Sequence, residues 1–167
     1  MSNHLLYFAY GSNMHPRRMK KRAPHSQFVC TATLHRYKLY FHKKGKDESG
    51  KCNAYFTDNP FHRVFGVVYR ISASDKLALD KVEGLGSGYD AAKIDVFANN
   101  HYSHVFAYLA NPDYIDDQLI PFSWYKQLVI QGAGIHGFPA SYVKRIQNIT
   151  AIADTDAIRA RNHLNHL

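Results

Sequence analysis

The residue best placed for proton transfer is Glu83, because of its position in an amphipathic segment. A helix is expected from about Asp75 to Glu83, with Gly84 as its stop signal. Residues three and four apart are neighbours on a helix, so Glu83 lies beside Leu79 and Val82 on the apolar side. Burial and the negative end of the helix dipole both disfavour a charged carboxylate there, which suits general acid/base catalysis near neutral pH. The alternative is a glutamate that reaches solvent or pairs with an arginine.

The second chemical feature is the segment Tyr10-Gly11-Ser12-Asn13-Met14, which lies between an expected strand and an expected helix. A helix start leaves backbone N–H groups without acceptors, and together with the helix dipole these groups attract anions. Gly11 would let a ligand approach the backbone closely. The alternative is an ordinary capped helix in which Ser12 or Asn13 is the cap.

Other residue types carry weaker signals. Tyr89, Tyr125 and Tyr142 could contact a ligand, although half-buried core positions are the more usual place for tyrosine. The histidine pairs 101/104 and 163/166 could each form one edge of a metal site, but no third ligand matches them, so we predict no metal. The two cysteines fit no metal or redox spacing and indicate buried, reduced thiols in a cytoplasmic protein.

The composition is that of a globular protein with a basic surface. The 167 residues carry a net charge of +8, concentrated in residues 17–22 and 35–51. We interpret these runs as a solvated helix face and an exposed loop at residues 43–51. The alternative is a nucleic-acid surface, but no motif that reads nucleic acid accompanies the charge. No apolar stretch is long enough to span a membrane, and no secretory signal is evident at the N-terminus.

The elements that must position these residues follow from local patterns. Ser74 is the expected N-cap of the Glu83 helix, and Asn99-Asn100 the expected turn of a hairpin. Strands dominate the first two-thirds of the chain and helices the last third, which predicts an α+β domain. Strands are expected at residues 5–10, 28–33, 37–42, 52–56, 64–71, 94–97 and 103–109, and helices at 16–22, 75–83, 123–131 and 141–149.

Several of these segments together resemble the γ-glutamyl cyclotransferase family. The octapeptide from Tyr7 to Met14 is similar to its signature, and the segment from Leu79 to Gly84 is similar to its catalytic glutamate segment. The segments at 64–69, 87–89 and 123–142 also resemble family segments, in the same order. The resemblance covers about residues 4–149, so we expect one domain over 1–150, with 151–167 as a C-terminal helix or tail outside it.

The resemblance implies a small mixed β-barrel or strongly curved sheet flanked by helices. It also implies a cofactor-independent enzyme, often dimeric, that converts a γ-glutamyl compound into 5-oxoproline and a free amine or amino acid. Glu83 would be the general acid/base, while Tyr10, Gly11, Ser12, Asn13, Met14, Tyr89 and Tyr125 would bind the substrate. The leaving group is not specified. The alternatives are a non-catalytic binding module of the same fold and a basic protein associated with nucleic acid.

Overall fold

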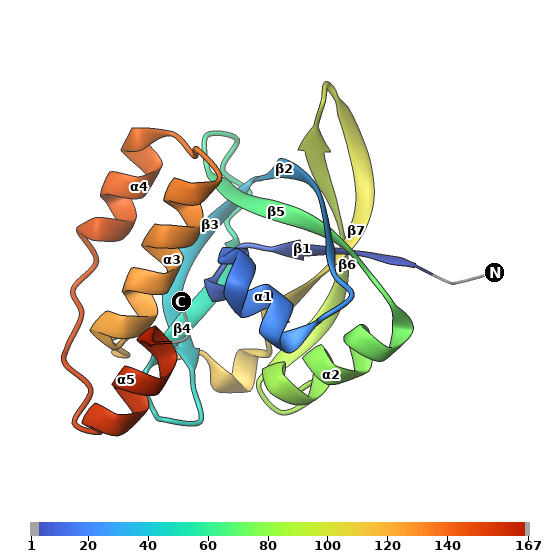
Figure 1. Cartoon of the computed structure of the whole chain (residues 1–167). Coiled ribbons are helices and arrows are strands. Elements are labelled where there is room, and N and C mark those ends of the chain that lie inside the picture. The colour runs from blue at the N-terminus through green and yellow to red at the C-terminus, as the bar shows by residue number, and fades with distance from the viewer. Residues whose placement is uncertain (1–3, 166–167) are drawn as a thin grey trace.

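The computed structural model describes residues 4–165, and its centre is a closed β-barrel (Figure 1). The barrel order is β1-β5-β2-β6-β7. β1 pairs antiparallel with β5 and parallel with β7, where Tyr7 lies opposite Phe106 and closes the barrel without an open edge. Its strands are β1 (Leu5–Ala9), β2 (Gln27–His35), β5 (Arg63–Ile71), β6 (Tyr89–Ala98) and β7 (His101–Ala110). The predicted α+β class with a mixed barrel is confirmed.

A separate hairpin of β3 (Tyr37–Lys44) and β4 (Gly50–Phe56) stands beside the barrel. The expectation of an exposed loop over residues 43–51 is wrong, because both strands extend into this segment and Lys43 and Ser49 are buried. Gly50 allows the close packing, since a Cβ atom there would lie 2.1 Å from the carbonyl oxygen of Phe41. Packing of the hairpin therefore buries Lys43 and Ser49, which the polarity of the local sequence does not reveal.

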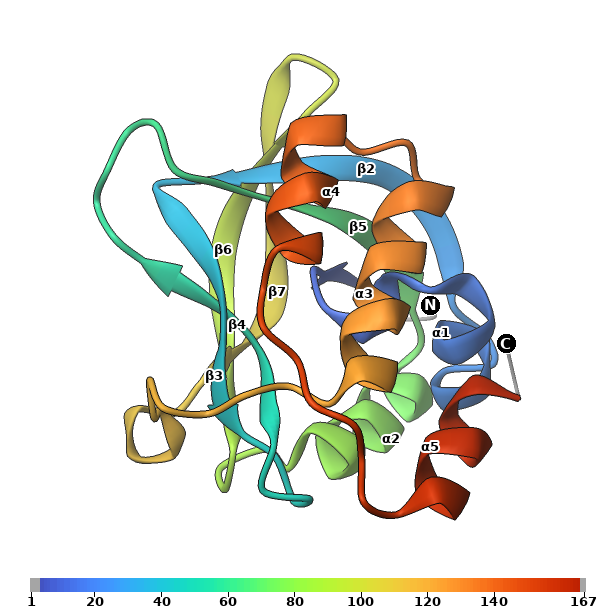
Figure 2. The same ribbon diagram turned by 90° about the vertical axis from the view of Figure 1, so that its left-hand side faces the viewer.

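Helices cover the outside of the strands. α3 packs against the first 3₁₀ helix and against α4 and α5, and Figure 2 shows α3 and α4 side by side. The helical segments are η1 (Ser12–Met14), α1 (Pro16–Arg22), α2 (Ala73–Glu83), η2 (Pro112–Tyr114), α3 (Ser123–Ile135), α4 (Ala140–Gln147) and α5 (Ala157–Leu164). The final segment therefore contains a helix that packs on the rest of the protein.

Two of the local signals are confirmed and one is wrong. Gly84 ends α2 in the left-handed conformation, with φ of 67°, and Asn99 and Asn100 form the β6–β7 turn with φ of 50° and 64°. The N-cap of α2 is Ser72 rather than Ser74, since the Ser72 hydroxyl accepts a hydrogen bond of 3.1 Å from the Asp75 N–H. The helix begins one residue after Ser72, so Ser74 lies inside its first turn.

The barrel core positions the segment that leads to η1. Residues Tyr7 to Tyr10 are all buried, which agrees with the prediction of a buried strand for all but its first residues. Because β1 is fixed on both sides by β5 and β7, the chain that leaves it at Gly11 enters η1 from a rigid support.

Candidate active site

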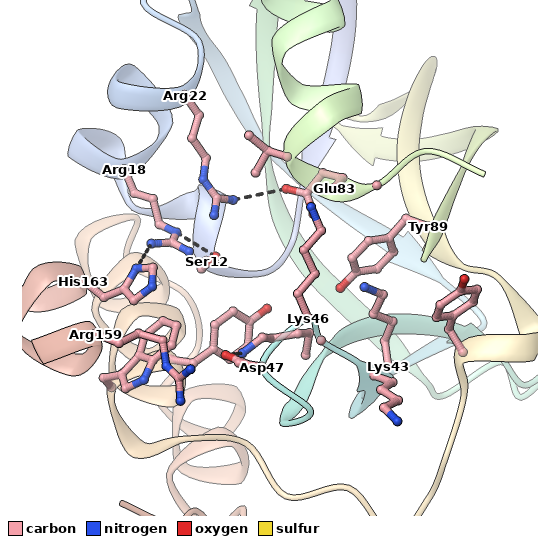
Figure 3. A pocket seen from close by; sticks show the side chains of 18 of the residues that line it. Ser12, Arg18, Arg22, Lys43, Lys46, Asp47, Glu83, Tyr89, Arg159 and His163 are labelled. Atoms are coloured by element: carbon pink, nitrogen blue, oxygen red, sulfur yellow. Dashed lines mark hydrogen bonds and ion pairs between the residues drawn. The ribbon is translucent and has the colours of Figure 1, made fainter. Parts of the chain in front are cut away.

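Two cavities meet at Glu83. An outer cavity of about 510 Å³ lies between α1, the C-terminal end of α2, the β3–β4 hairpin and α5 (Figure 3). An inner cavity of about 30 Å³ lies beneath it, against β1 and the barrel. Four residues line both cavities: Ser12, Glu83, Tyr89 and Tyr125. The two cavities therefore share a wall, and Glu83 is part of that wall.

Glu83 is the last residue of α2, and two side chains hold its carboxylate. Oε1 accepts a hydrogen bond of 3.0 Å from Nδ2 of Asn13 and one of 3.2 Å from Arg22. The side chain is 15% exposed, so it is covered but reachable from the cavity. The arginine partner named as an alternative is thus present, and the pair lies in the cavity wall.

The environment of Glu83 differs from the expected apolar stripe. Leu79 is fully buried, whereas Val82 is 42% exposed and lines the outer cavity. The last turn of α2 projects beyond the barrel, so only its earlier residues pack against the core. Glu83 therefore lies at the edge of the helix packing, in a polar setting made by Asn13 and Arg22.

Asn13 connects the loop to the carboxylate. Its Nδ2 also donates to the hydroxyl oxygen of Tyr7 at 3.0 Å, and its Oδ1 accepts from Arg22 at 2.7 Å. With its amide anchored on β1 through Tyr7 and on α1 through Arg22, Asn13 has one orientation in which it can donate to Glu83. The predicted link between the loop and the glutamate is therefore a direct contact in the structure.

The loop itself is packed closely. A Cβ atom on Gly11 would lie 3.1 Å from Cβ of Cys52 and 3.3 Å from the Tyr125 hydroxyl, so a larger residue would push on the cavity wall. Ser12 is buried, and its hydroxyl accepts a hydrogen bond of 3.0 Å from Arg18. Ser12 and Asn13 begin η1, and their N–H groups therefore have no acceptor within that helix.

The tyrosines of the site are fixed by backbone groups. Tyr89 donates to the carbonyl of Cys52 at 2.6 Å, Tyr125 accepts from the Cys52 N–H at 3.1 Å, and Tyr10 donates to the carbonyl of Tyr108. Burial raises the pKa of Tyr10, Tyr89 and Tyr125 well above its usual value. These hydroxyls therefore remain neutral at physiological pH. Tyr10 and Tyr89 already donate their O–H protons to backbone carbonyls and offer only an acceptor, whereas Tyr125 accepts from the backbone.

Two of the candidate residues lie elsewhere. Met14 is fully buried beneath α3, where a Cβ atom on Gly132 would be 2.9 Å from Cβ of Met14, and it lines neither cavity. Its carbonyl accepts hydrogen bonds from Tyr69 and His136. Tyr142 packs in the core beside Phe65. The other substrate-binding candidates all line the inner cavity.

The sequence did not identify the cationic residues of the outer cavity as part of the site. Arg18 and Arg22 come from the basic run expected to face solvent, and Lys43 and Lys51 from the expected loop. The i, i+4 spacing of Arg18 and Arg22 places both on one face of α1, which was the available signal. Nothing local marks Lys43, because its position depends on the hairpin docking against the rest of the fold.

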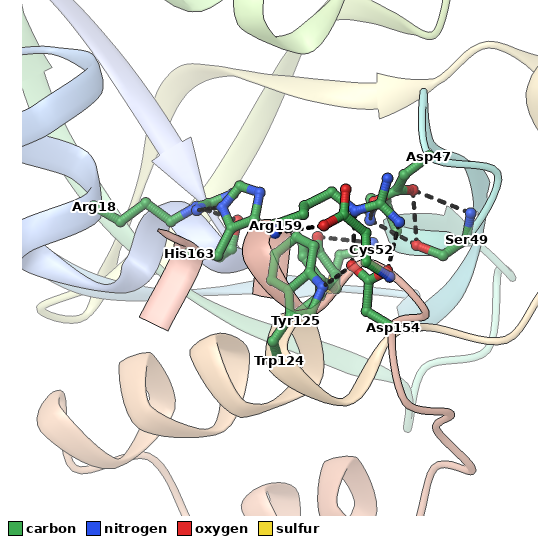
Figure 4. Close-up of polar contacts among 12 residues, drawn as sticks. Arg18, Asp47, Ser49, Cys52, Trp124, Tyr125, Asp154, Arg159 and His163 are labelled. Carbon is green, nitrogen blue, oxygen red and sulfur yellow. Dashed lines mark hydrogen bonds and ion pairs between the residues drawn. The ribbon is translucent and has the colours of Figure 1, made fainter. Parts of the chain in front are cut away.

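The C-terminal segment supplies the remaining wall of the outer cavity (Figure 4). Asp154 accepts hydrogen bonds from the Trp124 indole at 2.9 Å and from two Arg159 nitrogens at 2.7 and 2.5 Å. These bonds hold the pKa of the Asp154 carboxyl well below its usual range. His163 stacks on Trp124 at 3.9 Å and contacts Arg18 at 3.2 Å. Arg159 and His163 thereby face the cavity.

No group of three metal-ligating side chains occurs in the part of the chain that the structure describes. His104 contacts Asp95 on β6, His101 is exposed, and His166 lies outside the described residues. Cys30 and Cys52 carry free thiols. Within residues 4–165, none of the helices is long and apolar enough to cross a membrane.

Comparison with known proteins agrees with this arrangement. The family model described as gamma-glutamyl cyclotransferase, AIG2-like, matches residues 7–127. Gamma-glutamylcyclotransferases of Bos taurus and Homo sapiens are 31% and 30% identical over 148 residues, which are 86% of this chain and 78% of each relative. A solved structure titled "Gamma-glutamyl cyclotransferase" is 26% identical with a TM-score of 0.84, over 96% of this chain and 97% of that one. The chain therefore belongs to the gamma-glutamyl cyclotransferase, AIG2-like family.

Proposed function

We propose that this protein is a γ-glutamyl cyclotransferase that forms 5-oxoproline and releases an amine or amino acid, with Glu83 as its acid/base residue. The observation that carries the proposal is the direct contact of Glu83 with Asn13, at the junction of the two cavities. The carboxylate and the anion-binding loop are thereby within reach of one small substrate. Membership of the family supports the reaction class.

The chemistry needs few protein groups. The substrate's α-amine attacks its own γ-carbonyl carbon, a C–N bond forms to close the five-membered lactam, and the original amide C–N bond breaks. Both reacting groups belong to one molecule, so orientation and proton transfer supply most of the catalysis. Glu83 as carboxylate accepts a proton from the attacking nitrogen and returns it to the leaving nitrogen.

The loop would hold the glutamyl part of the substrate. Its α-carboxylate is placed at the N–H groups of Gly11, Ser12 and Asn13, beside the Arg18 guanidinium. The Tyr125 hydroxyl would donate to the γ-carbonyl oxygen, while Tyr89, whose O–H donates to the Cys52 carbonyl, would form the cavity wall beside it. Arg22 and Asn13 hold the Glu83 carboxyl at the cavity wall, where it would meet the attacking nitrogen.

The test is turnover of γ-glutamyl-alanine, measured as 5-oxoproline formed, by the wild type and Glu83→Gln. Glutamine keeps the shape and the oxygen acceptor but cannot carry the proton, so kcat should fall at least about a thousandfold. The exposed Asp58→Asn, between β4 and β5 and outside the cavity, makes the same carboxylate-to-amide change and should keep wild-type kcat. Turnover that survives Glu83→Gln would refute the assigned role of this residue.

The alternative that the basic surface binds nucleic acid can be tested with the same purified protein. Salt-sensitive binding of RNA by a protein that turns over no γ-glutamyl compound would favour that alternative. A protein that binds γ-glutamyl compounds without turnover would be a binding module of the same fold. Sedimentation of the purified protein would test the expected homodimer.

A further inference from the structure

The outer cavity contains more positive charge than its own carboxylates neutralise. Seven cationic side chains line it, and four of them are paired with carboxylates. The pairs are Arg22–Glu83 at 3.2 Å, Lys44–Glu48 at 3.4 Å, Lys51–Asp47 at 2.7 Å and Arg159–Asp154 at 2.5 Å. The other three, Arg18, Lys43 and Lys46, have no carboxylate partner within residues 4–165.

Lys43 is the most unusual of the three. It is 7% exposed, yet its ammonium forms no hydrogen bond or ion pair with the described residues and lies 4.4 Å from the centre of the Tyr89 ring. Burial lowers the pKa of Lys43, and Lys51 and Lys46 nearby lower it further, while Glu83 opposes the shift. The stem of Lys43 is covered while its ammonium reaches the cavity without an anion, and a ligand bound there would supply that anion.

The ammonium packs against the backbone at Gly88, where a side chain would crowd it. A Cβ atom at Gly88 would lie 2.9 Å from Nζ of Lys43. The cation–π contact with Tyr89 also favours the charged form at this position. Lys43 is therefore held near the substrate-facing tyrosine by its surroundings rather than by an acidic partner.

Arg18 and Lys46 occupy different parts of the cavity. Arg18 reaches the loop through Ser12 and contacts His163, and the remaining N–H groups of its guanidinium are available. Lys46 is exposed at the tip of the hairpin, and its side chain extends across the cavity toward Glu83 (Figure 3). The three unpaired cations thus surround the proposed reaction centre on separate sides.

We infer that the leaving group is a dicarboxylic amino acid, so that the substrate is a γ-glutamyl-glutamate or γ-glutamyl-aspartate type of dipeptide; this rests on the proposed function. Such a substrate has three carboxylates, one for each unpaired cation. The glutamyl α-carboxylate faces Arg18, the α-carboxylate of the leaving amino acid faces Lys43, and its side-chain carboxylate faces Lys46. A cationic leaving group would instead meet like charges, which disfavours binding.

The experiment compares kcat/KM for γ-glutamyl-glutamate and γ-glutamyl-glutamine, which have nearly the same shape and differ in one charge. We expect the wild type to prefer the glutamate dipeptide at least about tenfold at low salt, because the added carboxylate gains an ion pair with Lys46 and the attraction of the other unpaired cations of the cavity. The preference should shrink in about 0.5 M salt, where charges are screened over a few ångströms.

Two lysine variants test whether the side-chain carboxylate of the leaving amino acid pairs with Lys46. Lys46→Gln should reduce the preference to within about threefold, since it removes the cation that distinguishes the two substrates. Lys81→Gln removes the same charge from the exposed side of α2, outside the cavity, and should retain the wild-type preference. A wild-type ratio near one, or a ratio that Lys46→Gln leaves unaltered, would overturn the inference.

Failure of the inference and failure of the proposed function are separable. If the wild type turns over γ-glutamyl-glutamine as well as γ-glutamyl-glutamate, the function stands and the acidic subsite is rejected. If neither dipeptide is turned over, calorimetric titration with both decides the matter. Tighter binding of γ-glutamyl-glutamate would support the subsite without the reaction, and equal or absent binding would reject it.

Discussion

Asn13 contacts the acid/base candidate, the barrel and α1 with a single amide. Replacing it with alanine removes the hydrogen bond of 3.0 Å that orients Glu83. We expect kcat for γ-glutamyl-alanine to fall about a hundredfold, because a displaced reacting group is costly to catalysis. Parallel thermal unfolding separates this effect from a loss of fold. A variant with wild-type kcat would show that Asn13 does not position Glu83.

Lys43 supports a second prediction, in which stability and activity change in opposite directions. Lys43→Met keeps the apolar stem and removes the buried charge, so the free energy of unfolding should rise by about 1 kcal/mol near pH 7. Folding lowers the pKa of Lys43 below 10.5, so the charged lysine destabilises the wild type at neutral pH. This destabilisation disappears as pH rises towards 10.5, so the free energies of unfolding of the wild type and Lys43→Met should then become equal.

Measurement of kcat/KM completes that test. Lys43→Met should lose turnover of γ-glutamyl dipeptides while it gains stability, as expected of a residue retained for its ligand. Urea unfolding at pH 7 and pH 10 gives the stability difference. Lys38→Met, at an exposed position on the same strand, is the matched control for removal of a lysine charge. A less stable Lys43→Met protein would contradict the prediction.

Among the elements, α5 is the one whose attachment should respond to pH. Burial, together with Arg18, Arg22 and Lys51, lowers the pKa of His163 to about 4, and Asp47 opposes the shift. A histidine whose pKa is lowered on folding stabilises the folded form above its ordinary value of 6.5, and the contribution is lost as pH falls toward 4. Acidification should therefore weaken the contact between α5 and α3.

The chain provides its own probe for this change, because Trp124 is its single tryptophan and stacks on His163. Its fluorescence should shift between pH 6.5 and pH 4, before global unfolding as followed by circular dichroism. His163→Gln cannot gain the proton and should lose the separate fluorescence transition. An unaltered transition in that variant would assign it to another group.

For the whole molecule, the close contact of β5 with β1 at Gly66 leaves no space for added volume in the barrel. A Cβ atom on Gly66 would lie 2.5 Å from two Phe8 ring atoms and 2.6 Å from the carbonyl oxygen of Ala9. Phe8 is fully buried, so the ring cannot move aside freely. We expect Gly66→Ala to lower the free energy of unfolding by about 2 kcal/mol or more.

Gly134 is the matched control for Gly66. A Cβ atom there meets nothing within 4 Å, and the residue lies in α3, so Gly134→Ala should stabilise the protein by about 0.5 kcal/mol through helix propensity. Chemical unfolding of both variants gives the comparison. A Gly66→Ala protein as stable as the wild type would show that the barrel can widen at this crossing.

Local sequence was sufficient for much of the element pattern. The ending of α2 at Gly84 and the turn at Asn99-Asn100 were predicted because left-handed backbone favours glycine and asparagine. The start of α1 followed in the same way from Pro16. By contrast, the N-cap was assigned to Ser74 instead of Ser72, since two serines near the start of a helix give the same local signal.

The sequence by itself determined the barrel family and the pairing of Glu83 with the segment Tyr10 to Met14, because short-range motifs and their order encode both. Only the tertiary structure decided that Arg18, Arg22 and Lys43 face that pair, that Val82 does not pack in the core, and that α5 closes one side of the cavity. The physical reason is that burial of a charged side chain depends on which distant elements pack over it. The composition of a basic segment is the same whether it faces water or a cavity.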